Sequence, residues 1–164
     1  RDRINIASSV RRLVVDVTRN WSKNSILWNY AADPQNDPHT DNGGCSMCQG
    51  AITIDGDKVT RNIAYYAMAH ASKFVRPGSV RISSTDAFDP GVDITEDEER
   101  AEVRRATVVE HSNVLPNVAF KTPDGKIVLI VANDSWSQQA VKIQYNGRFA
   151  NLRLAPGSVG TFIW

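Results

Sequence analysis

The stretch Lys126-Ile-Val-Leu-Ile-Val-Ala132 is a continuous run of apolar, mostly branched side chains. A run of this length and composition is typical of a central β-strand that is buried on both faces. Shorter β-favouring runs surround it at residues 80–82, 107–109, 117–120, 139–145, 149–154 and 158–164. The turn signals between them are Pro123-Asp124-Gly125, Asn146-Gly147 and Pro156-Gly157. Strands at this spacing predict an antiparallel β-sandwich over residues 78–164.

One segment inside this β-rich half does not fit the strand pattern. Residues 86–105 are too highly charged for a core, and we expect a solvated insert between two strands of the sandwich. A calcium site is the alternative. Its acidic residues, however, lack the alternating spacing with glycine that a Ca²⁺ loop requires.

The first half of the chain has a different pattern. Apolar residues at helical spacing predict helices over residues 3–20 and about 62–75, the second with Asn62 as its N-cap. Between them, Ser25-Ile-Leu-Trp-Asn-Tyr-Ala31 indicates a short buried strand. A long loop without periodicity follows over 33–50, and a hairpin is expected around Asp55-Gly56-Asp57.

A lone buried strand between two helices has no sheet to join, and its backbone groups need neighbours on both sides. Residues 1–77 therefore look like the last helix–strand–helix portion of an incomplete (β/α)8 barrel whose other strands are not in this chain. The predicted fold is mainly β: this barrel remnant at 1–77, followed by the sandwich at 78–164. We also expect Arg1 to be a cut point within a longer protein.

The overall composition excludes several classes of protein. The chain has 164 residues, with 19 Lys and Arg against 18 Asp and Glu, for a net charge of +1. A balance this close to neutral gives no electrostatic reason to expect a nucleic acid or an anionic membrane as a partner. No apolar run is long enough to be a transmembrane segment.

Several motifs follow one another along the chain: Asn20-Trp21, Leu27-Trp-Asn-Tyr-Ala31, Gly43-Gly-Cys-Ser-Met-Cys48, Tyr65-Tyr66, His70-Ala-Ser-Lys-Phe-Val-Arg-Pro-Gly-Ser79, Val118-Ala-Phe120 and the ending Ala155-Pro-Gly-Ser-Val-Gly-Thr-Phe-Ile-Trp164. Taken in this order, these motifs resemble the C-terminal part of glycoside hydrolase family 30, the family of glucosylceramidases and endo-β-1,6-glucanases. Each piece is weakly specific by itself. The ordered set covers most of the chain outside the charged insert.

This resemblance implies a retaining β-glycosidase that hydrolyses β-glucosidic or related bonds in glycans or glycolipids. Retention needs two carboxyl groups across the scissile bond, one as nucleophile and one as acid/base, and the family places these glutamates on the fourth and seventh barrel strands. All glutamates of this chain lie between residues 96 and 110, in the insert or the sandwich. We therefore name no catalytic residue and expect the chain to be inactive alone.

The sugar site would retain part of its wall. Trp28 lies at the expected C-terminal end of the last barrel strand, where an indole face can stack on a sugar ring. Asn29 beside it can hydrogen-bond a hydroxyl or hold the loop. Because side chains alternate along a strand, both point inward only if the strand ends there. The alternative is that Trp28 belongs to the core.

Cys45 and Cys48 form a Cys-x-x-Cys pair in the long loop. We consider three interpretations of this pair: a redox-active pair, half of a zinc site, and a local cross-link that stabilises the loop. Redox chemistry favours a helix N-terminus after a strand, and zinc needs two more ligands, of which only His39 is near in sequence. We favour a loop-stabilising disulfide or a pair of packed thiols, and we expect no metal and no cofactor.

A second hypothesis is a non-catalytic carbohydrate-binding or structural β-sandwich module that uses Trp136, Tyr145, Phe149 and Trp164. Under the first hypothesis, the partners are a carbohydrate and the remaining barrel strands of the parent chain, with self-association where the lone strand stays unpaired. The resemblance also implies a secreted, periplasmic or cell-surface location, although the chain itself shows no signal peptide.

Overall fold

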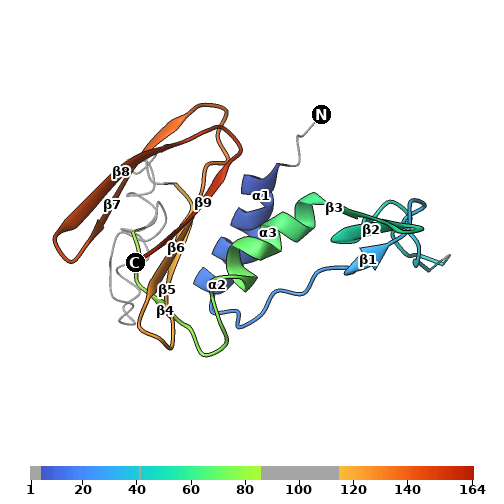
Figure 1. The fold of residues 1–164 in the computed structure, drawn as a ribbon, viewed down its shortest axis with the longest axis horizontal. Coiled ribbons are helices and arrows are strands. Elements are labelled where there is room, and N and C mark those ends of the chain that lie inside the picture. The colour runs from blue at the N-terminus through green and yellow to red at the C-terminus, as the bar shows by residue number, and fades with distance from the viewer. Residues whose placement is uncertain (1–4, 41, 86–114) are drawn as a thin grey trace, which may run out of the picture.

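The computed structural model describes residues 5–40, 42–85 and 115–164. These residues form stacked layers (Figure 1). A two-stranded β-ribbon lies on one side of a four-stranded sheet, and the helices cover the other side of that sheet. Beyond the helices, a small three-stranded sheet projects away from the rest of the molecule (Figure 1).

The two predicted helices are present. The first runs continuously through α1 (Ile6–Val10), a π-helical stretch η1 (Arg11–Asp16) and α2 (Val17–Arg19), and the second is α3 (Ile63–Ser72). Asn5 caps α1, its side-chain oxygen accepting a 2.8 Å hydrogen bond from the Ser8 amide. Asn62 occupies the N-cap position of α3 but makes no side-chain cap. Its amide donates instead to Gly50 O and Thr53 Oγ1 and ties the long loop to the helix.

The main sheet has the strand order β4-β5-β6-β9, and all its pairings are antiparallel. Its strands are β4 (Val80–Ile82), β5 (Asn117–Lys121), β6 (Ile127–Ala132) and β9 (Val159–Ile163). The run that predicted a central strand is β6, and five of its six residues are buried. It is central because it pairs with β5 on one edge and β9 on the other.

The ribbon consists of β7 (Gln139–Tyr145) and β8 (Arg148–Leu154), paired antiparallel. The turn between them is Asn146-Gly147, with φ of 47° and 74°. Such positive φ values at both central residues explain the Asn-Gly signal of the sequence. Ribbon and main sheet form the β-sandwich predicted for this half of the chain.

The hydrophobic core lies between the helices and the main sheet. Val10, Val14, Val15 and Ala67 come from the helices, and Val118, Phe120, Val128 and Ile130 come from β5 and β6; each is at most 7% exposed. One core thus contains side chains from both sides of residue 77. We call α1, η1, α2, α3 and the main sheet together the helix–sheet unit.

Polar contacts also join the helices to the sheet. The Arg11 guanidinium lies 2.6 Å from Asp134 Oδ2, and Arg19 donates to Ser84 Oγ and to the carbonyl of Asn117. His70 Nδ1 of α3 lies 2.8 Å from Thr161 Oγ1 of β9. These contacts fix how the helices lie on the sheet, because a directional polar contact allows fewer orientations than apolar packing.

We call residues 22–61 the arm. It contains the small sheet β1-β2-β3, in which β1 (Ala31–Ala32) pairs parallel with β2 (Ile52–Asp55), and β2 forms the expected hairpin with β3 (Lys58–Arg61). The prediction of a buried strand over 25–31 is wrong. Only its last residue, Ala31, belongs to a strand, and Ile26 is 88% exposed. The described residues provide no neighbouring strands for the segment, so it stays extended and unpaired for most of its length.

Some sequence predictions lie outside the described residues. They are the solvated insert at 86–105, the strand at 107–109 and all the glutamates.

Candidate functional site

The extended segment at residues 25–30 leads into β1 and lies along α3. Burial alternates along it: Ser25, Leu27 and Asn29 are half-buried, while the residues between them are exposed. Alternation with a period of two is the signature of a strand with one covered face. The segment therefore has the side-chain pattern of a strand although its backbone has hardly any strand partners.

The covered face borders a groove of about 570 Å³. Leu27, Asn29 and Tyr30 line it from the segment, and the lining residues from α3 and its C-terminal end are Tyr65, Met68, Ala69, Ser72 and Lys73. The side-chain oxygen and nitrogen of Asn29 are both buried, and neither has a hydrogen-bond partner among the described residues. Its backbone is better satisfied, because Asn29 O accepts a 3.1 Å bond from the Ala51 amide.

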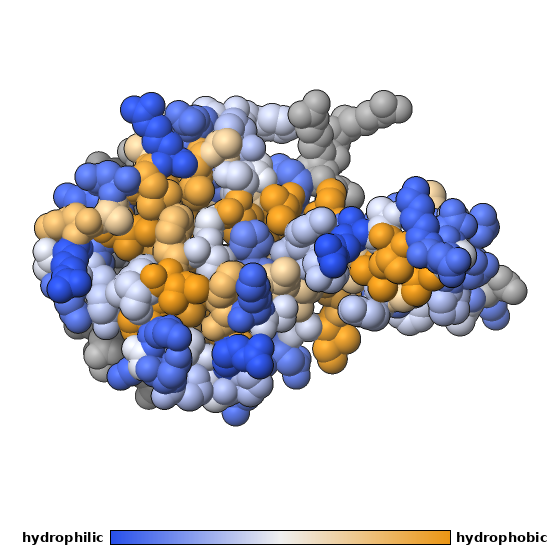
Figure 2. All heavy atoms as spheres, viewed as in Figure 1, coloured by the Kyte–Doolittle hydropathy of each residue, from blue (hydrophilic) through white to orange (hydrophobic). Residues whose placement is uncertain are grey.

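The exposed residues of the segment carry three large side chains, of which Tyr30 also borders the groove. Ile26, Trp28 and Tyr30 are 88%, 60% and 72% exposed. Figure 2 shows that hydrophobic surface also gathers on the projecting small sheet. Trp28 is thus not a core residue of this chain. The side-chain polar atoms of the neighbouring Asn29 are buried, so the structure exposes Trp28 and covers Asn29.

The long loop after β1 has internal order. Asp33 Oδ1 accepts hydrogen bonds from the backbone amides of Gln35 and Asp37, at 2.8 and 2.9 Å. Cys45 and Cys48 are joined by a disulfide. At Gly50 the loop returns to β1, and a Cβ there would lie 2.7 Å from Ala32 N, so only glycine allows the approach.

His39 lies in the same loop, with its Nδ1 2.8 Å from Asp37 Oδ1. It does not join Cys45 and Cys48 in a ligand set. No group of three or more His, Cys, Asp or Glu residues in the described part of the chain is arranged to hold a metal ion.

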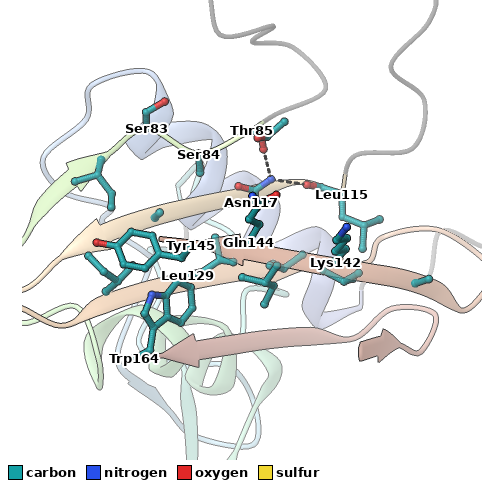
Figure 3. A pocket seen from close by; sticks show the side chains of 17 residues that line it. Ser83, Ser84, Thr85, Leu115, Asn117, Leu129, Lys142, Gln144, Tyr145 and Trp164 are labelled. Carbon is teal, nitrogen blue, oxygen red and sulfur yellow. Dashed lines mark hydrogen bonds between the residues drawn. The ribbon is translucent and has the colours of Figure 1, made fainter. Parts of the chain in front are cut away.

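A second cavity, of about 650 Å³, lies between the main sheet and the ribbon (Figure 3). Leu129, Ile143 and other sandwich residues line it, so it is the interior of the sandwich. At its rim the Asn117 amide donates to the carbonyls of Thr85 and Leu115 (Figure 3).

The aromatic residues of the alternative carbohydrate-binding module are dispersed. The rings of Tyr145 and Trp164 lie 5.6 Å apart at the cavity, tilted by 56°. The Lys142 ammonium lies over the Phe149 ring, 4.6 Å from the centre of that ring. Trp136 is 84% exposed. The Tyr145 and Trp164 rings, being tilted, do not form a flat surface for a sugar.

Among the residues that the structure describes, two titratable groups have clearly shifted pKa values. Desolvation lowers the pKa of His70 below its usual 6.5. The pKa of Asp124 is lowered by its hydrogen bonds to Lys126 and Thr122 at an exposed turn. The shift of Asp124 is opposite in direction to the raised carboxyl pKa expected of a glycosidase acid.

Comparison with known proteins places the chain in a family. Residues 103–162 match the glycosyl hydrolase family 30 beta sandwich domain. The chain is 36% identical over 115 residues to endo-1,6-beta-D-glucanase BGN16.3 of Trichoderma harzianum, which covers 70% of this chain and 20% of the relative. The chain corresponds to the C-terminal portion of a glycoside hydrolase family 30 protein.

Other relatives agree. Endo-1,6-beta-D-glucanase neg1 of Aspergillus fumigatus is 37% identical over 70 residues, covering 43% of this chain and 14% of the relative. The family 30 chain therefore spans a fifth or less of the length of these curated relatives.

Solved structures extend the similarity into the helices and the arm. The endo-beta1,6-glucanase BT3312 superposes with a TM-score of 0.72 at 25% identity, over 97% of this chain and 31% of its own. SrfJ from Salmonella typhimurium superposes with a TM-score of 0.70 at 22% identity, over 99% of this chain and 32% of its own. The fold of nearly the whole chain thus recurs inside longer proteins.

Sequence reasoning missed the groove and the buried amide of Asn29. In the sequence, residues 25–30 are an apolar and aromatic run, and such a run does not reveal which face a distant helix covers. The residues of this segment predicted a strand. Which face of the segment is covered depends on the position of α3, and the sequence does not show that position.

Proposed function

We propose that this chain supplies the last helix–strand–helix portion of a (β/α)8 barrel and the β-sandwich of a retaining β-glycosidase that acts on β-1,6-glucan. The observation that carries the proposal is the exposure of Ile26 and Trp28 on a segment with strand alternation. Inside a closed barrel, alternate side chains of each strand point to the interior. These two side chains would then face the barrel axis, and their exposure here follows from the lack of the other strands.

The roles of individual residues follow from this placement. Trp28 would contribute an aromatic surface to the sugar site at the C-terminal end of its strand, where barrel enzymes place their sites. The two carboxyl groups that retention requires, about 5–5.5 Å apart, would come from barrel strands outside this chain. Asn29 would not line the sugar site, because it faces α3.

The disulfide supports a secreted or cell-surface location for the parent enzyme. Disulfides persist in oxidising compartments and are rare in the cytosol. The Cys45–Cys48 bond lies in an exposed loop, where cytosolic reductants would reach it.

A chimera tests the proposal. The segment of the Trichoderma harzianum relative that matches this chain is replaced by residues 1–164, and release of reducing ends from a linear β-1,6-glucan is measured. The chimera should hydrolyse the glucan, while the chain alone should not exceed buffer. Trp28→Ala in the chimera should lower kcat/KM roughly tenfold, equivalent to about 1.4 kcal/mol of lost transition-state stabilisation.

Trp136→Ala is the matched control, because Trp136 is exposed on a different part of the surface and its loss should leave kcat/KM unchanged. A chimera that does not fold or has no glucanase activity would contradict the proposal. Hydrolysis by the isolated chain well above buffer would also contradict it, because the chain would then contain its own catalytic carboxyl groups.

A further inference from the structure

Two stretches of the sequence have the pattern Asn-X-Ser in which the middle residue is not proline. They are Asn20-Trp21-Ser22 and Asn133-Asp134-Ser135. This pattern is the acceptor for N-linked glycans in secretory pathways that attach them. Because the pattern is short and frequent, it identifies a site only where the folded chain leaves the asparagine accessible. The structure separates the two asparagines on this point.

Asn133 cannot carry a glycan in this fold. It is fully buried, and its Nδ2 donates to the carbonyls of Ser137, Leu154 and Ala155, at 2.9, 2.9 and 3.0 Å. Its Oδ1 accepts a 2.7 Å bond from the Ser135 hydroxyl. A glycan replaces one of the two hydrogens of an asparagine amide. At Asn133 it would break bonds that join the end of β8 to the turn after β6, and it would have to fit inside the fold.

Asn20 meets both requirements that Asn133 fails. It is exposed, as are the four residues that follow it. It is the C-cap of α2, and its Nδ2 donates one hydrogen bond, of 2.8 Å, to the carbonyl of Asp16. This bond uses one amide hydrogen. The other can be replaced by a glycan while the bond to the helix is kept.

The turn after Asn20 is fixed by contacts within the same chain. The backbone amides of Trp21 and Ser22 donate to the carbonyls of Thr18 and Val17, a pattern that ends a helix. The Arg81 guanidinium of β4 lies over the Trp21 ring, 4.4 Å from the centre of that ring. The acceptor asparagine is therefore positioned by contacts to the helix–sheet unit.

We propose that Asn20 is the N-glycan acceptor of this chain in a secretory pathway that N-glycosylates, and that Asn133 is not used. The step transfers an oligosaccharide from a lipid-linked pyrophosphate donor. The bond between the sugar C1 and the pyrophosphate oxygen breaks, a bond between C1 and Asn20 Nδ2 forms, and Nδ2 loses one proton as the lipid pyrophosphate leaves. The inference uses only the secreted location from the proposed function, and neither its barrel nor its substrate.

Mapping the glycan on the secreted chain tests the inference. The full chain is secreted from a eukaryotic host, and the protein in the medium is treated in heavy-oxygen water with the amidase that removes N-glycans. This treatment converts each glycosylated asparagine into an aspartate that carries the heavy oxygen, and peptide mass spectrometry locates it. The label should appear at Asn20 and not at Asn133.

Two serine variants give a matched pair. Ser22→Ala removes the first acceptor pattern but keeps Asn20, so the amidase should no longer change the electrophoretic mobility of the chain. Ser135→Ala removes the second pattern, and the mobility shift should stay as in the wild type. If either variant is not secreted, the mapping on the wild-type chain still distinguishes the two asparagines. If the wild-type chain is not secreted, the chimera described above takes its place.

An unlabelled Asn20 in the secreted protein would overturn the inference, because exposure of the amide would then not suffice. A label at Asn133 in a protein that keeps the circular dichroism spectrum of the folded chain would overturn it too. A chimera that is labelled at Asn20 but has no glucanase activity removes the proposed function and keeps this inference. An active chimera without that label does the reverse.

Discussion

The helix–sheet unit and the arm differ in where their structural partners come from. In the unit, the helices bury Val10, Val14 and Val15 against strands of the same chain, and Ile130 of β6 is fully buried. Among the described residues of the arm only Ala32 and Gly50 are buried. A helix satisfies its own backbone and needs only an apolar surface to pack on, whereas an extended segment needs neighbouring strands for its backbone groups. The described residues provide the apolar surface that the helices need, but hardly any strand partners for residues 25–30.

The largest expected effect is a core truncation that separates the two regions. Ile130→Ala should lower the free energy of unfolding by about 3 kcal/mol, because it leaves a cavity between the helices and the main sheet. Ile26→Ala in the arm is the matched control, and it should change that free energy by less than about 0.5 kcal/mol. Urea titration of both variants measures the difference. Equal losses would mean that Ile26 is as well packed as Ile130, which would contradict the comparison.

The same comparison explains what the sequence could predict. Strand β6 followed from its apolar run, and the turn at Asn146-Gly147 followed from two residues that tolerate positive φ. Both signals are local, and the surrounding structure supplies the partners that each signal requires. Residues 25–31 carried an equally clear strand signal, but burial depends on partners, and the described residues hold none for the exposed Ile26 and Trp28.

Contacts between distant residues could not be predicted from one sequence. The Arg19 bonds to Ser84 and Asn117 and the contact of His70 with Thr161 join elements far apart in the chain. No local pattern marks Arg19 as different from other surface arginines of its helix. For the candidate site, the sequence predicted Trp28 at a strand end but did not show which way Asn29 points, because the position of α3 decides that.

A smaller effect is expected for the disulfide, and it sharpens the boundary between the two regions. Replacing Cys45 and Cys48 together by serine should speed amide hydrogen exchange around residues 45–48, since this short stretch of the loop loses its cross-link. The global free energy of unfolding should change by less than about 0.5 kcal/mol, because the loop contributes nothing to the core of the helix–sheet unit. Exchange mass spectrometry and urea titration give the two readouts. A large global loss would show that the arm and the unit unfold together.

The smallest effect concerns His70, which reports on the contact between α3 and β9. Burial lowers its pKa in the folded chain below 6.5, so the unfolded chain binds a proton more readily. The stabilising contribution of the neutral imidazole is fully present above pH 6.5. It is lost as the pH falls from 6.5 toward the lower folded pKa.

Urea titrations at pH 7.5 and 5.5 measure this effect. The wild type should lose slightly more stability on acidification than His70→Gln, which keeps a polar side chain near Thr161 but does not titrate. The difference between the two proteins cancels the carboxyl groups that they share. An equal loss in both would mean that the histidine is as well solvated in the folded chain as in the unfolded one. The helices would then be less closely docked on the sheet than the core of the unit requires.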